Sequence, residues 1–93
     1  MHDRATFRIA DHVRASSSED GLVLLDVLGG IVLSSNPIGA RIWQLIAERV
    51  CCVDIAVQLT RDYDVPLDRA RRDVAAFVSS LEQRRLIHPE PSW

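Results

Sequence analysis

The chain has 93 residues and a mass of 10.4 kDa, which fits one small domain and leaves little volume for an enclosed active site. Apolar residues make up 47% of the chain and charged residues 26%, a balance that favours folding over disorder. The formal net charge of −2 argues against a nucleic-acid binder, because such proteins usually carry a basic face.

Three features predict a cytoplasmic protein. No stretch approaches the roughly 18 consecutive apolar residues of a membrane span. The first ten residues are polar and lack the apolar core of an export signal. Cys51 and Cys52 are adjacent and have no third cysteine to pair with, so they provide no disulfide framework. We interpret them as ordinary buried or edge cysteines, with a functional thiol pair as the alternative.

The first third of the chain predicts three antiparallel strands in a meander. Residues 7–15 read as a strand with imperfect alternation, and residues 16–21 as a turn rich in serine. Residues 22–28 form a short apolar run bounded by turn signals, which is typical of a strand. Gly29-Gly30 is a two-residue hairpin signal, and residues 31–33 give the third strand.

The hydrophobic period changes after the serines at 34–35. Asn36 (or Ser35) is a candidate N-cap with Pro37 at the first helical position, and apolar residues recur at helical spacing over about 37–48. Asp54 is a candidate cap for a second helix that ends near Tyr63.

A third helix, the longest, is predicted after the break at Pro66. It opens at Asp68 and continues to about Arg85, with an apolar stripe of Ala70, Val74, Phe77, Val78 and Leu81. Residues 88–91 read as a frayed tail. The predicted fold class is α+β, a winged helix-turn-helix in which a three-stranded antiparallel sheet is followed by three α-helices. We expect a single domain over residues 1–93 with an ordered core at about 7–88.

The side chains needed for catalysis or metal binding are not assembled by the sequence pattern. His2, His12 and His88 lie at no metal-ligand spacing from the cysteines, and no serine has the context of a nucleophile. Gly29-Gly30 precedes no helix and so forms no phosphate loop. We therefore predict a protein that is not an enzyme, with no catalytic residues, no metal site and no cofactor.

Two kinds of binding module share this predicted architecture. A winged-helix domain usually places its last helix in the DNA major groove, and this one carries Arg69, Arg71 and Arg72. Asp68, Asp73 and Glu82 weaken that positive potential, so DNA binding is the weaker alternative.

Strand addition is the stronger alternative. A small sheet has an open edge, and an extended peptide can pair with it and place alternate side chains in a groove. The third strand, residues 31–33, is short and apolar. The small residues of the third helix either leave space for such a peptide or simply pack well: Ala75, Ala76, Ser79 and Ser80.

Several segments together resemble the PqqD-like proteins over roughly residues 20–88. They are Gly-Leu-Val-Leu-Leu-Asp at 21–26, Gly-Ile-Val-Leu-Ser-Ser-Asn at 30–36, Gly-Ala-Arg-Ile-Trp at 39–43, Val-Asp-Ile-Ala-Val-Gln-Leu at 53–59 with Asp62-Tyr63, and Asp73-Val74, Phe77, Leu81 and Arg85-Leu86-Ile87. The family's usual Leu-Asn pair is separated here by two serines, which predicts a longer strand-to-helix corner.

This resemblance implies a recognition element for ribosomally synthesised, post-translationally modified peptides. The precursor's leader would add as an antiparallel strand, and the protein would present it to a leader peptidase (a transglutaminase-like cysteine protease) and then to a macrocyclase. The chain looks most like the stand-alone lasso-peptide versions of actinobacteria. The alternative within the family is a peptide chaperone of pyrroloquinoline quinone biosynthesis, whose usual Pro-Glu before the strand is missing here. An open edge and two cysteines also permit a dimer, while nucleic acid and membrane are not expected partners.

The resemblance also implies which residues bind the leader. On the strand they are Gly30, Ile31, Val32, Leu33 and Ser34, acting through backbone groups. On one flank of the third helix they are Arg69, Asp73, Ala76, Phe77 and Ser80.

Overall fold

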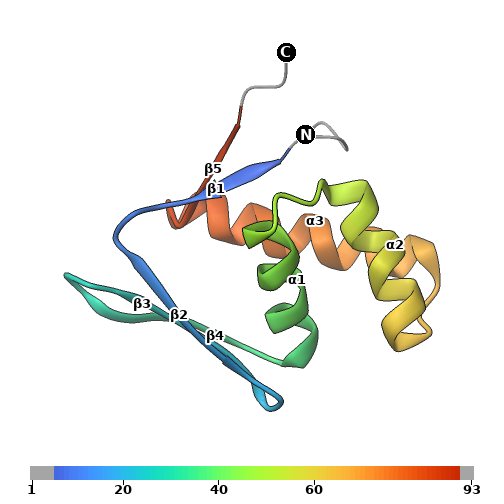
Figure 1. The fold of residues 1–93 in the computed structure, drawn as a ribbon, viewed down its shortest axis with the longest axis horizontal. Coiled ribbons are helices and arrows are strands. Elements are labelled where there is room, and N and C mark those ends of the chain that lie inside the picture. Colours follow the sequence, from blue (N-terminus) through green and yellow to red (C-terminus); the bar gives the residue numbers. More distant parts are fainter. Residues whose placement is uncertain (1–5, 91–93) are drawn as a thin grey trace.

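The computed structural model describes residues 6–90, and Figure 1 shows a sheet on one side of the molecule and three helices on the other. The strands are β1 (Phe7–Ile9), β2 (Val13–Ser18), β3 (Gly21–Asp26), β4 (Gly30–Ser35) and β5 (Ile87–Pro89). The helices are α1 (Pro37–Ala47), α2 (Cys52–Tyr63) and α3 (Leu67–Gln83). The predicted α+β fold, with a three-stranded antiparallel sheet followed by three helices, is confirmed.

The hydrophobic core lies between the sheet and the helices. β3 buries Leu22 and Leu24, which the two-residue period of a strand places on one face. α1 packs against this sheet, and α2 packs against α3. The apolar stripe predicted for α3 is buried except for Phe77, which is half-buried against the core. Each fully buried Leu contributes about 1.5–3 kcal/mol, so this cluster is the main source of stability.

The single strand predicted for residues 7–15 is wrong, because the chain turns between β1 and β2. The N–H of Val13 donates to the Ala10 carbonyl at 3.1 Å, which closes a turn. This turn lets Phe7 and Val13 both enter the core from two different sheets. The imperfect alternation of this segment reflects the two strands that it contains.

The predicted frayed tail at residues 88–91 is also wrong for its described part. Ile87 to Pro89 form β5, which pairs antiparallel with β1 so that Arg8 lies opposite His88. The N–H of Glu90 extends the pairing by donating to the Thr6 carbonyl at 2.9 Å. Pro91 lies outside the described residues. β1 and β5, from the two end regions of the chain, therefore pair as a two-stranded sheet (Figure 1).

The Glu90 side chain fastens this pair of strands to the rest of the molecule. Its carboxylate forms an ion pair with Arg49 and accepts a hydrogen bond from Thr6 Oγ1 at 3.2 Å. The hydrogen bond from the Arg49 guanidinium, followed by its positive charge and the Thr6 hydrogen bond, holds the pKa of Glu90 below its ordinary value of 4.5.

We expect Glu90→Gln to weaken the pH dependence of stability in acid. A carboxylate whose pKa is lowered in the folded state stabilises the fold above its unfolded pKa, and this stabilisation is lost as the pH falls through the folded value. The melting temperature of wild type should therefore exceed that of the variant at pH 7, and the small difference should shrink below about pH 4.5. Glu19→Gln in the exposed β2–β3 turn is the control. A difference between wild type and Glu90→Gln that stays constant from pH 7 to pH 3 would contradict this role.

The two hairpin turns differ from those predicted. Ser16 to Ser18 belong to β2, so the β2–β3 turn contains only Glu19 and Asp20. The β3–β4 loop is 27–29 rather than Gly29-Gly30, and the Asp26 side chain accepts the N–H of Leu28 at 2.9 Å. Of the two glycines, only Gly30 has a positive φ, at 87°. β4 consequently starts earlier and ends later than predicted.

The N-cap predicted for α1 is confirmed, whereas the N-cap predicted for α2 is not the one that the structure shows. The Asn36 side chain accepts the N–H of Gly39 at 2.9 Å, and Pro37 follows at the first helical position, as predicted. The prediction of Asp54 as a cap is wrong, since Cys51 is the N-cap of α2 and Asp54 lies in the first turn. There the carboxylate still interacts favourably with the helix dipole.

Candidate functional site

β4 is an edge strand of the three-stranded sheet, whose order is β2-β3-β4. Within residues 6–90 no strand pairs with its outer side. An edge strand presents alternate N–H and C=O groups to its unpaired side, and these are the groups that an extended peptide requires. The arrangement therefore permits a fourth strand to add to this sheet.

The opposite edge, β2, is less suited to a peptide with apolar side chains. After Val13, every residue of β2 is exposed and most are polar. On β4, in contrast, Val32 and Leu33 pack partly against the core. A peptide added to β4 would therefore meet apolar surface, which a peptide on β2 would not.

A β-bulge interrupts the pairing of β4 with β3. Leu33 lies opposite Leu24 and Ile31 lies opposite Leu25, so Val32 has no partner in the ladder. A bulge leaves one residue unpaired and increases the local twist of the strand. β4 is thus regular from Leu33 to Ser35 and irregular at Val32.

The five strand residues predicted for the site form one continuous edge. Gly30, Ile31 and Ser34 are exposed, whereas Val32 and Leu33 are half-buried. Ile31 is 70% exposed, an unusual state for an isoleucine within a strand. Next to it, the β3–β4 loop exposes Val27 and Leu28, which gives this end of the hairpin an apolar surface.

The five predicted α3 residues do not all reach β4. The Phe77 ring lies next to the corner between β4 and α1. A Cβ added at Gly39, in this corner, would contact both the Phe77 ring and the Ser35 side chain. Arg69 and Asp73 form an exposed ion pair with each other at 3.9 Å. Asp73 lies one helical turn before Phe77 and Arg69 lies two turns before it, and no described interaction joins either of them to β4.

Ala76 is exposed and Ser80 half-buried on the same side of α3 as Phe77. The small side chains at these positions project little from this flank of the helix and leave space beside it. The backbones of β4 and α3 do not pack closely together.

Arg84 joins α3 to β4 and was missed by the sequence prediction. This residue is the C-cap of α3, and its Nη1 donates to the Val32 carbonyl at 2.9 Å. Its position continues the helix stripe, since it follows Phe77 by seven residues and Ser80 by four. Extending the predicted flank by one turn would have found it.

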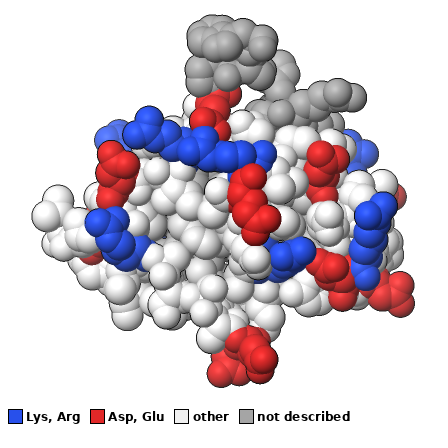
Figure 2. Space-filling view, in the orientation of Figure 1, with Lys and Arg blue, Asp and Glu red and all other residues white. Residues whose placement is uncertain are grey.

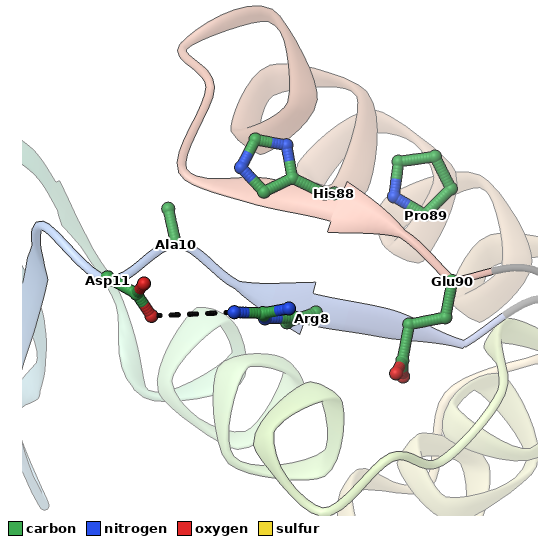
Figure 3. Close-up of a pocket in the computed structure, with 6 residues that line it drawn as sticks. All are labelled: Arg8, Ala10, Asp11, His88, Pro89 and Glu90. Atoms are coloured by element: carbon green, nitrogen blue, oxygen red, sulfur yellow. Dashed lines mark ion pairs between the residues drawn. The ribbon is translucent and has the colours of Figure 1, made fainter.

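Two hollows of the surface lie away from β4. One, of about 410 Å³, lies beside the paired chain ends (Figure 3). It is lined by Arg8, Ala10, Asp11, His88, Pro89 and Glu90. Its only ion pair between lining residues joins Arg8 to Asp11 at 3.8 Å, across exposed side chains (Figure 3). Such an open, solvated hollow offers neither a nucleophile with a base nor a shielded acid.

Other candidate chemistry is not brought together either. Within residues 6–90 no group of three or more histidine, cysteine, aspartate or glutamate side chains is placed to hold a metal ion. The two cysteines have different environments. Cys52 is buried in the core, whereas Cys51 is half-buried and its Sγ donates a hydrogen bond to the Asp54 carboxylate at 3.4 Å. This agrees with their interpretation as ordinary buried or edge cysteines, and the burial of Cys52 disfavours its use in a disulfide-linked dimer.

The charges of the surface do not form a basic face on the side that Figure 2 shows. Arginine side chains there lie interspersed with aspartate and glutamate side chains. Ion pairs such as Arg41 with Asp62, at 3.0 Å, neutralise part of this positive charge. A DNA-binding surface would concentrate the positive charge instead.

Edge strand, bulge and facing helix together define a winged helix-turn-helix domain whose sheet keeps one apolar edge open. The family model described as coenzyme PQQ synthesis protein D (PqqD) matches residues 21–87. The chain therefore belongs to the PqqD family, which confirms the resemblance drawn from its motifs.

Two solved structures are similar to this chain along nearly its whole length. The first is lasso peptide synthetase B1 complexed with the leader peptide, which is 32% identical, has a TM-score of 0.78, and is matched over 89% of this chain and 98% of that one. The second is TbiB1 in complex with the TbiA(β) leader peptide, at 26% identity and a TM-score of 0.78, over 91% and 99%. A comparison with curated proteins finds no match. Among the described residues, no helix is long and apolar enough to cross a membrane.

Proposed function

We propose that this chain is a leader-recognition element for a ribosomally made peptide of the lasso class. The observation that carries the proposal is the open, partly apolar edge of β4 in a chain similar to two proteins solved with leader peptides. Backbone groups of β4 would bind the leader as an added antiparallel strand, and its side chains would lie between β4 and α3.

The proposed binding residues fall into two groups. The backbone of Gly30 to Ser34 supplies hydrogen bonds, so side-chain changes there act through register and burial. On α3, Ala76, Phe77 and Ser80 form the floor of the groove. Arg69 and Asp73 lie at its far end, where they would orient polar groups of the leader.

The protein itself performs no chemistry in this proposal. It holds the precursor in the cytoplasm and presents it to a leader peptidase and afterwards to a macrocyclase. Its small core and solvated hollows support a binding role, because catalysis requires a shielded and preorganised site.

Titration of a labelled leader peptide tests the proposal. The probes are a fluorescein-labelled leader of about 15 residues from the precursor encoded beside this chain, the TbiA(β) leader as a second probe, and the precursor's core peptide as the control. We expect a micromolar or tighter Kd for the cognate leader and little binding of the core, since several backbone bonds and apolar anchors add up on one edge. No binding of either leader at tens of micromolar would contradict the proposal.

The family description favours one other peptide substrate, the precursor of pyrroloquinoline quinone. The same titration with that precursor separates the two functions, since a single groove should prefer one leader. Tighter binding of the quinone precursor than of the lasso leader would assign the chain to the alternative.

A further inference from the structure

The guanidinium of Arg84 occupies a position on β4 that an added strand would need. The unpaired bulge residue Val32 has no partner in β3, and its carbonyl accepts from Arg84 Nη1 at 2.9 Å. A neighbouring strand lies about 4.8 Å away and donates its N–H groups at about the same 2.9 Å. Arg84 therefore stands in for one backbone donor of the strand that is missing from this edge.

The positive charge of Arg84 has no carboxylate partner among the described residues. Four other arginines are ion-paired within residues 6–90: Arg8, Arg41, Arg49 and Arg69. Among these described residues, the Arg84 guanidinium bonds only to a neutral carbonyl, and the side chain remains exposed. A guanidinium has five N–H donors in a planar fork, of which one is used here, so most of its capacity to bind a carboxylate is free.

The surroundings of Arg84 are those of the proposed groove. It lies one helical turn beyond Ser80 and two beyond Phe77 on the same flank of α3. Exposed Ile31 adjoins the bulge on β4. A strand that covered Val32 would therefore place its side chains within reach of the Arg84 fork.

We propose that Arg84 selects a leader that carries an aspartate or glutamate beside the β4 bulge. The leader strand displaces the guanidinium from the Val32 carbonyl, and the fork then pairs with the acidic side chain. This inference rests on the proposed function and adds a rule for leader sequence to it. Arg84 thereby gives this edge a charge preference that the backbone bonds lack.

The test is a double-mutant cycle between the protein and the leader. The cognate leader is titrated with each acidic residue replaced in turn by its amide, against wild type, Arg84→Ala, Arg84→Lys and the control Arg72→Ala. Arg72 is exposed on α3 about a third of a turn around the helix from Arg84. Melting temperatures of the free proteins show that the variants fold.

We expect one amide substitution to weaken binding to wild type by about fivefold to tenfold and to have no further effect on Arg84→Ala. Arg84→Lys should bind with intermediate affinity because lysine lacks the fork, and Arg72→Ala should bind like wild type. The loss should shrink as salt is raised.

Equal or tighter leader binding by Arg84→Ala would overturn the inference, as would a cycle in which no acidic residue couples to Arg84. In both cases the wild-type chain still binds its leader and the proposed function stands. Failure of the wild-type chain to bind any leader would overturn the proposed function, and this inference with it.

Discussion

Of the two variants Leu33→Pro and Ser34→Pro, one should lose thermal stability and the other should keep its fold but lose leader binding. Leu33 pairs with Leu24 and Ser34 pairs with Val23, so both lie in the regular part of β4. The N–H groups of adjacent strand residues point to opposite sides. Proline removes this donor and adds a ring in its place.

The variant whose N–H faces β3 loses a ladder bond, which should lower the melting temperature by on the order of 10 °C. The variant whose N–H faces outward should melt like wild type and bind the leader at least about tenfold more weakly. Circular dichroism melts and fluorescence titration measure the two effects. Leu33→Ala and Ser34→Ala are the matched controls, because they remove the side chains and keep both donors.

Leader binding that survives in both proline variants would show that the peptide uses another edge of the molecule. The alternative edge is β2, and its polar residues would then have to supply the contacts. This outcome would remove the proposed groove while leaving the fold as described.

The elements that the sequence predicts correctly are those specified by neighbouring residues. The cap at Asn36, Pro37 and the four-residue spacing of Ile38, Ile42 and Ile46 lie within three helical turns, so α1 can be read locally. The same holds for the apolar run that forms β3. The two serines from which we inferred a longer corner lie within β4, and Asn36 alone separates this strand from α1.

The β1–β5 sheet could not be predicted because its two strands contact each other across the length of the chain. Arg8 and His88 lie opposite each other although 80 residues separate them, and neither strand exceeds three residues. Local composition around Pro89 favours an irregular tail. Only the tertiary pairing with β1 makes this segment a strand.

The candidate site was predictable in its strand and less so on its helix. The edge residues follow from strand order alone, whereas the helical residues depend on how α3 lies against β4. A stripe of Arg69, Asp73 and Phe77 is correct as helix geometry, yet only Phe77 reaches the β4 corner. The helix stripe extended by one turn includes Arg84, but its bond to β4 involves the bulge residue Val32, and nothing in the local pattern of this strand indicates a bulge.

Gly21→Ala should be the most destabilising glycine substitution in the sheet. Gly21 has a φ of 146°, in a region that side chains rarely adopt, and a Cβ there would overlap the carbonyl oxygen of Ser35. Backbone strain of this kind costs about 1–3 kcal/mol, and the overlap adds to it. We expect the melting temperature to fall by roughly 10 °C or more.

Substitutions at two other glycines distinguish backbone strain from steric overlap as the cause of this loss of stability. Gly30 has a φ of 87° with open space around it, so Gly30→Ala carries strain alone and should be intermediate. Gly29 has no positive φ, and the nearest atom to an added Cβ is 3.7 Å away, so Gly29→Ala should melt near wild type. Equal melting temperatures for Gly21→Ala and Gly29→Ala would contradict the close approach of β3 to Ser35.

The same contact should also affect leader binding, because Ser35 is the last residue of the open edge of β4. A Gly21→Ala protein that remains folded should therefore bind the leader more weakly, which would link this contact to the shape of the groove.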